Sequence, residues 1–172
     1  GTVWTGLYGG GLRKLSEGRW TTYTTANDLA DDQVFSITQD REGSLWIGTR
    51  RGLNRLVDGQ FTTFTTEHGL PHDNIKALHV DSKGVLWVGT RGGGLARYLY
   101  DEFIPFEIEQ ELTANQKLVY SIHEDEDGVL WFGTFGGLIR HEDGRSDIFT
   151  IREGLHDDAA YQILEDGRGN LW

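Results

Sequence analysis

The sequence predicts an all-β protein built from repeated small antiparallel sheets, and three observations lead to this class. A tryptophan recurs at intervals of 41–44 residues, at positions 4, 46, 87, 131 and 172. The phrase around it also recurs, and residues 45–49 show it as Leu-Trp-Ile-Gly-Thr. Short apolar runs alternate with turn residues between the tryptophans. A period of about 40–45 residues is typical of proteins in which copies of one supersecondary unit stack on each other.

One repeat contains four short runs rich in β-branched and aromatic residues. In the second repeat they are residues 34–40, 44–49, 53–57 and 61–65. Glycine-containing turns separate them, and the last is Asp58-Gly59, a strong signal for a two-residue hairpin. Four strands joined by tight turns form an up-and-down meander.

Four-stranded meanders arranged radially form a β-propeller, in which each sheet is one blade. We therefore predict one β-propeller segment over residues 1–172, with about four blades. The expected blades cover about 34–65, 75–106 and 119–151, and a further blade combines 2–24 with 160–166. A closed four-bladed ring and an open arc of a larger propeller both remain possible. The chain starts and stops inside a repeat, so we expect it to be a piece of a longer protein, and open blade edges would favour self-association.

Two recurring features of the repeat have structural interpretations. An Asp-x-x-Gly turn follows the first strand, as at Asp40 and Gly43, and aspartate and glycine are favoured turn residues. Calcium binding by these aspartates is the alternative. The tryptophans are expected to fill the seams between blades, with ligand stacking as the alternative. Pro105 should lie on an outermost strand, because proline cannot donate a hydrogen bond to a sheet.

The composition excludes several classes of partner. The net charge of −11 disfavours nucleic acid, whose phosphates require clustered Lys and Arg. There is no cysteine, so neither disulfides nor thiolate metal sites are available. We expect no cofactor and no metal ion. No apolar run approaches the roughly 20 residues that a membrane helix needs.

The composite pattern resembles the two-component regulator propeller repeat. Residues 45–55 (LWIGTRRGLNR), 61–65 (FTTFT) and 69–71 (GLP) show it well, and residues 81–97 repeat it. The resemblance implies the periplasmic sensing part of a membrane-anchored bacterial hybrid two-component protein, in which carbohydrates or other small molecules are the usual ligands. It also implies that this segment is not an enzyme, whatever output domain the parent protein carries. Rings in this family are larger, commonly of seven blades, so the resemblance favours an open arc over a closed four-bladed ring.

The strand order predicts where a ligand binds. Turns between the second and third strands should share one face with the connections between repeats, and loops on a rigid scaffold carry binding. The candidate ligand-binding residues are Tyr8, Arg50, Arg91, Phe135, Asp32, Asp73, Asn74, Lys117 and Asp158. Aromatic rings, arginines and acids around a shallow opening suit sugar recognition, although a merely solvated polar rim has the same composition.

Two other functions remain open. A propeller of this kind can serve as a protein-interaction scaffold. Some propellers are lyases that use His and Arg near the axis, and His79 and His123 occupy equivalent positions in two repeats. Equivalent positions in a repeat are most simply explained by packing.

Overall fold

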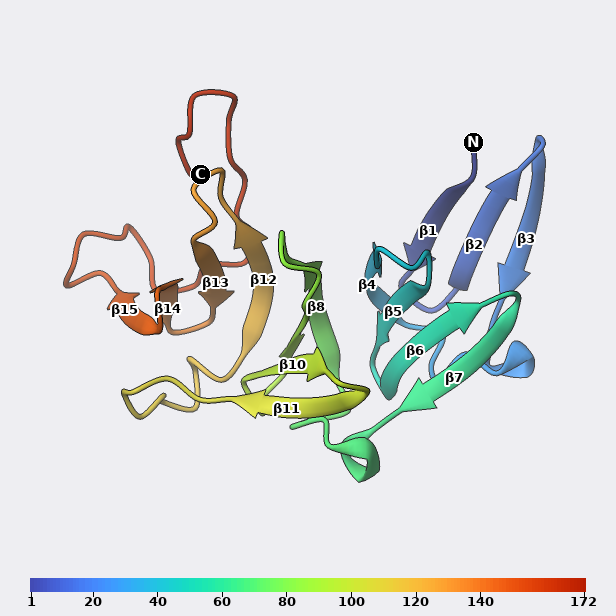
Figure 1. The fold of residues 1–172 in the computed structure, drawn as a ribbon, viewed down its shortest axis with the longest axis horizontal. Helices are drawn as coiled ribbons and strands as arrows, with labels where there is room; N and C mark the ends of the chain where they lie inside the picture. Colours follow the sequence, from blue (N-terminus) through green and yellow to red (C-terminus); the bar gives the residue numbers. More distant parts are fainter.

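The computed structural model describes residues 1–172 and consists of four antiparallel sheets that follow one another around an open arc (Figure 1). Blade I contains β1 (Val3–Leu7), β2 (Gly11–Ser16) and β3 (Arg19–Tyr23). Blade II contains β4 (Val34–Gln39), β5 (Leu45–Thr49), β6 (Gly52–Val57) and β7 (Gln60–Phe64). Blade III contains β8 (Ile75–Val80), β9 (Leu86–Thr90), β10 (Leu95–Leu99) and β11 (Glu102–Phe106). Blade IV contains β12 (Val119–Glu124), β13 (Leu130–Thr134), β14 (Gly137–Glu142) and β15 (Arg145–Phe149).

Each blade is a meander, because sequence neighbours are also hydrogen-bonded neighbours in every sheet. The strands β4, β8 and β12 lie innermost, and β3, β7, β11 and β15 lie outermost (Figure 1). We name the positions A to D from the inside outward, so that blade I has only B, C and D. The all-β, four-stranded blade architecture predicted from the sequence is confirmed, and Pro105 lies on an outermost strand, β11.

Two short 3-10 helices, Thr25–Asn27 and Thr66–His68, follow β3 and β7. They lie in the connections from strand D to the next strand A. No helix in the structure has the length and apolar character that crossing a bilayer requires.

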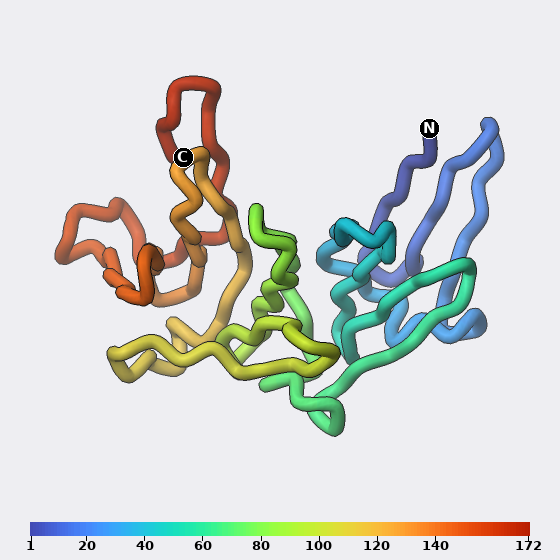
Figure 2. Tube along the Cα trace, in the orientation of Figure 1, coloured from blue at the N-terminus to red at the C-terminus, as the bar shows by residue number.

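Residues 160–166 differ from the arrangement expected for a closed blade. The amide of Ala160 donates to Thr134 O at 2.8 Å, so this segment continues from blade IV. Leu164 and Trp172 then exchange backbone hydrogen bonds of 3.0 and 2.8 Å, which makes a short hairpin instead of a pairing with β1. The two ends of the chain lie on opposite arms of the arc (Figure 2). The structure therefore has the open arrangement.

Three apolar clusters lie at the three seams between blades. The cluster of Trp46 with Ile75, Leu86 and Val88 joins blade II to blade III. The cluster of Trp87 with Val119 and Phe132 joins blade III to blade IV, and Trp4 packs on the cluster between blades I and II. Each buried indole removes about 150–250 Å² from water, roughly 4–6 kcal/mol gross at ~25 cal/mol per Å².

How deeply each tryptophan is buried depends on whether its blade has a neighbouring blade on both sides. Trp46 and Trp87 are 1% and 4% exposed, while Trp4 and Trp131 are half-buried. Trp172 is 77% exposed and does not fill a seam. The seam-filling role predicted from the sequence is therefore confirmed for the indoles that have a blade on both sides.

The glycine two residues after each strand B tryptophan lets the next blade approach closely. A Cβ on Gly89 would lie 2.8 Å from Val119 Cγ1, and one on Gly48 would lie 2.8 Å from Ile75 Cγ2. Real Cβ atoms essentially never come this close, so only glycine fits without displacing the neighbouring blade. This explains the invariant third residue of the Trp-x-Gly-Thr phrase in the repeats.

The turn aspartates hold the tryptophans in place. Asp81 Oδ2 accepts from Trp87 Nε1 at 2.8 Å, while its Oδ1 accepts from the amides of Lys83 and Val85. Asp40 and Asp125 bind Trp46 and Trp131 in the same way, both at 2.7 Å. A cation from strand C lies over each indole, with Arg55 5.3 Å from the Trp46 ring centre. Turn, indole and cation therefore form one repeated unit.

We predict that Asp81→Ala destabilises the fold by roughly 1–3 kcal/mol, because it leaves the buried indole N–H of Trp87 without an acceptor. The melting temperature should fall by about 2–4 °C per kcal/mol for a chain of this size. Lys83→Ala, at an exposed position of the same turn, is the matched control. Calorimetry that gives Asp81→Ala the melting temperature of the control would contradict this role.

We also predict that a protein of these 172 residues alone self-associates. The edge of β1 has no strand A beside it, and Val3 and Trp172 at the two arms are 56% and 77% exposed. Unpaired sheet edges and apolar patches favour association. Light scattering should give a mass above 19.4 kDa that grows with concentration. A strict monomer at high concentration would rule this out.

Candidate functional site

The inner strand of each complete blade has a β-bulge near its start. The register shifts between Val34 and Ser36 in β4, between Ile75 and Ala77 in β8, and between Val119 and Ser121 in β12. A bulge leaves one residue outside the ladder and redirects its side chain. The three residues at these shifts are Phe35, Lys76 and Tyr120.

The turns between strands B and C meet these bulged residues on one face of the arc. The ring centres of Tyr8 and Phe35 are 6.1 Å apart, and those of Phe135 and Tyr161 are 6.3 Å apart. Tyr161 occupies the position equivalent to the bulged residues, and its ring centre lies 5.1 Å from that of Tyr120. The turn residue of one blade thus contacts the inner segment that follows it.

Backbone hydrogen bonds join the same turns to the connections between blades. The amide of Arg50 donates to Gln33 O at 3.2 Å, and the amide of Arg91 donates to Asn74 O at 2.9 Å. The amides of Gly92 and Gly94 donate to Lys117 O at 3.0 and 3.1 Å. The predicted sharing of one face by these turns and connections is therefore confirmed.

The centre of this face is cationic. Lys76 Nζ lies 3.2 Å from the ring centre of Phe35, and the positive charges of Arg91 and Arg50 act on it. None of these three cations takes part in the ion pairs of the structure. We call the cations, with the aromatic residues on either side, the axial ring. Its members are Tyr8, Phe35, Arg50, Lys76, Arg91, Tyr120, Phe135 and Tyr161.

The axial ring contains four of the residues that the sequence analysis proposed as ligand-binding, namely Tyr8, Arg50, Arg91 and Phe135. It adds Phe35, Lys76, Tyr120 and Tyr161, which sequence reasoning missed. Their signal is present in the repeats: a large or charged residue follows the first aliphatic residue of each inner strand, in the form Val-Phe-Ser, Ile-Lys-Ala and Val-Tyr-Ser. The register shift is known only from the structure, so the sequence alone did not place these residues on the face of the axial ring.

The proposed acidic residues are engaged in their own loops. Carboxylate oxygens of Asp32, Asp73 and Asp158 accept hydrogen bonds from the amides of Thr25, Thr66 and Ile151, each at 2.7 Å. Asn74 is buried, and its Oδ1 has no hydrogen-bond partner. These contacts give the three acids a structural task in shaping the connections, and their part in ligand binding remains a prediction.

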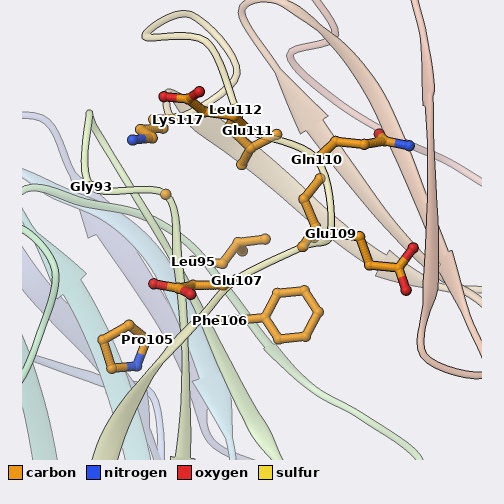
Figure 3. Close-up of a pocket in the computed structure, with 12 residues that line it drawn as sticks. Gly93, Leu95, Pro105, Phe106, Glu107, Glu109, Gln110, Glu111, Leu112 and Lys117 are labelled. Carbon is orange, nitrogen blue, oxygen red and sulfur yellow. The ribbon is translucent and has the colours of Figure 1, made fainter.

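Lys117 lines a pocket of about 400 Å³ formed by the long connection after β11, while its backbone oxygen accepts hydrogen bonds from the amides of Gly92 and Gly94, next to Arg91. Gly93, Leu95 and the segment from Pro105 to Leu112 line this pocket with Lys117, and Figure 3 shows Gly93 and Lys117 on one side of it and Glu109 and Gln110 on the other. Ile108 and Leu112 pack on the apolar cluster between blades III and IV, and Gln110 Nε2 donates to Ser146 O at 3.3 Å. The connection therefore fastens two blades together.

The repeat-equivalent histidines lie toward the other end of the inner strands. His123 Nε2 is 3.0 Å from Glu165 Oε2, and His79 Nε2 is 3.8 Å from Glu124 Oε2. Burial lowers the pKa of His79, against the opposing effect of Glu124. Each pair joins one inner strand to the next, as the packing interpretation expects. No group of three or more His, Cys, Asp or Glu side chains is placed to bind a metal ion.

The fold defines the chain as an arc of a β-propeller. The family described as two component regulator propeller matches residues 28–51, 69–92 and 114–136. Each match runs from an inter-blade connection through strands A and B to the B–C turn. These three segments are two-component regulator propeller repeats, and they contain six of the eight axial-ring residues.

Solved structures support the same fold. The extracellular domain of a protein described as a hybrid two component system from B. thetaiotaomicron is similar over 100% of this chain and 24% of its own, with a TM-score of 0.82 and 22% identity. The extracellular domain of a protein described as a one component system from the same organism is similar over 99% of this chain and 24% of its own, with a TM-score of 0.82 and 24% identity. This chain spans about a quarter of their length.

Virginiamycin B lyase from Staphylococcus aureus is similar over 100% of this chain and 59% of its own, with a TM-score of 0.77 and 19% identity. Because all of these sequence identities are below 25%, the similarity establishes the fold alone. A comparison with proteins of curated function gives no significant match.

We predict that the pKa of the Lys76 ε-amino group depends on the charges of its cationic neighbours. Burial lowers its pKa below the ordinary lysine value, and the charges of Arg91 and then Arg50 lower it further. Arg91→Gln should therefore raise the pKa of Lys76, because one repelling charge is removed. An NMR titration of the lysine side chains measures this, with Arg13→Gln on β2 as the control. A Lys76 pKa that is unchanged in Arg91→Gln would show that the two charges do not interact.

Proposed function

We propose that this chain is the ligand-sensing part of an extracytoplasmic propeller in a bacterial two-component or related signalling protein. It binds a carbohydrate or another small molecule at the axial ring. The observation that carries the proposal is the convergence, on one face, of aromatic and cationic side chains from all four blades. The two-component regulator repeats support the signalling context, and the extracellular origin of the structural relatives supports the location.

The axial ring has the chemistry that sugar recognition requires. Aromatic faces supply broad apolar contact, and guanidinium groups donate paired hydrogen bonds in a fixed plane. Arg50 and Arg91 are both exposed, and no protein carboxylate lies within ion-pair distance of either. Their donors are therefore available to a ligand. A lyase would instead need its acid–base groups at this face, and His79 and His123 are engaged with glutamates elsewhere.

Substituting Arg50 and Arg91 together by alanine tests the proposal. We expect the double variant to lose the binding isotherm that the wild type gives with at least one member of a panel of neutral and acidic oligosaccharides. The melting temperature should stay the same, because neither side chain has a structural ion pair. Isothermal titration calorimetry and a thermal melt provide the two measurements.

The control is the double variant Arg13→Ala and Arg51→Ala, which removes the same charge. Arg51 is adjacent to Arg50 but pairs with Asp31 at 3.5 Å, and Arg13 lies on β2. Equal binding by both double variants would remove the axial ring from consideration.

A further inference from the structure

We propose that the axial ring is selective for an acidic sugar, and that Lys76 binds its anionic group. The proposal rests on the proposed function and narrows it, because it names the class of ligand and the residue that selects it. Lys76 lies on this face because of its position at the β8 bulge.

Three cations gather on one face of a chain of net charge −11, in which acidic residues outnumber basic ones by 27 to 16. Among the Lys and Arg side chains, only Arg51, with Asp31 at 3.5 Å, and Arg140, with Glu142 at 2.7 Å, form ion pairs. What distinguishes Lys76, Arg50 and Arg91 is therefore their common face, on which no carboxylate lies within ion-pair distance of any of them.

The acids of the neighbouring connections do not pair with the three cations. Asp32 and Asp73 precede the inner strands that carry Phe35 and Lys76. Their carboxylates accept hydrogen bonds from the amides of Thr25 and Thr66, at 2.7 Å, and form no ion pair with the cations. An anionic ligand therefore has no ion pair with these acids to displace.

The three cations repel one another. The bulge in β8 holds the half-buried ammonium of Lys76 against the Phe35 ring, at 3.2 Å from the ring centre, where the charges of Arg91 and Arg50 act on it. Like charges destabilise one another, and more so out of bulk water. A bound anion reverses that effect, because each cation gains a charge-assisted hydrogen bond. The site is thus arranged to gain more from an anionic ligand than from a neutral one.

The aromatic residues on either side of the cations favour a ligand that contains a ring. Tyr8 and Phe35 lie on one side of the cations, and Tyr120, Phe135 and Tyr161 lie on the other, in ring-to-ring contact. A simple inorganic anion would leave these faces unused. A ring that carries a carboxylate or a sulfate uses both features, as a uronic acid or a sulfated sugar would.

The test measures the binding of three monosaccharides by calorimetry: D-glucuronate, D-glucose 6-sulfate and neutral D-glucose. We expect the wild type to bind at least one charged sugar saturably and more tightly than glucose, and the charged sugar that binds identifies the anionic group. Lys76→Met keeps the aliphatic contact with Phe35 and should weaken that binding about 10- to 100-fold. Lys76→Arg should retain it within a few-fold.

Lys14→Met is the matched control, because Lys14 also lies over an aromatic ring, 5.4 Å from the centre of Trp4, but on β2. It should bind like the wild type. The inference is overturned if neither charged sugar binds saturably, or if Lys76→Met binds as tightly as the wild type. If neutral oligosaccharides bind in a manner that depends on Arg50 and Arg91, and the charged sugars do not bind, this inference is overturned and the proposed function stands.

Discussion

The hydrogen bond between a turn carboxylate and an indole N–H is the contact on which the rest of the arc depends. In each complete blade it ties the A–B turn to the strand B tryptophan, at 2.7–2.8 Å. The indole then extends into the seam, where the next blade's apolar residues close over it. A buried indole N–H without an acceptor would be costly. The aspartate therefore permits an aromatic residue of this size to stand between two sheets, and the glycine two residues later lets the sheets approach.

A scaffold held together in this way does not depend on the side chains of the axial ring. The seams take their stability from strand B and from the A–B turns at one end of the blades. The bulged residues, the B–C turns and the inter-blade connections lie at the other end, joined to one another mainly through backbone hydrogen bonds. Side chains at Phe35, Lys76 and Tyr120 can therefore vary without loss of the seams. This separation explains how the repeat keeps one blade structure while its axial residues differ in charge and shape.

The candidate site was only partly predictable from the sequence. Tyr8, Arg50, Arg91 and Phe135 could be assigned because they follow a recognisable Gly-Thr phrase or its equivalent, and topology places such turns on one face. Lys76 could not, because strict alternation along a strand gives no sign of an extra residue at a bulge. Asp32, Asp73 and Asp158 were predicted as binding groups, yet the structure uses them to hold loop amides. A polar residue in a loop looks the same in sequence whichever of these tasks it performs.

The sequence by itself determined the local pattern: the period, the four strands, the Asp-x-x-Gly turn and the seam tryptophan. Each depends on residues close together in the chain, and hairpin and turn geometry is set by such neighbours. Only the tertiary structure decided how residues 160–166 are used, since they pair with residues 170–172 instead of β1. It alone also brought Lys76 under the influence of two arginines from different blades. The first outcome is a choice between a local hairpin and a pairing with β1 at the other end of the chain, and the second depends on residues that are not neighbours in the chain. Local pattern specifies neither.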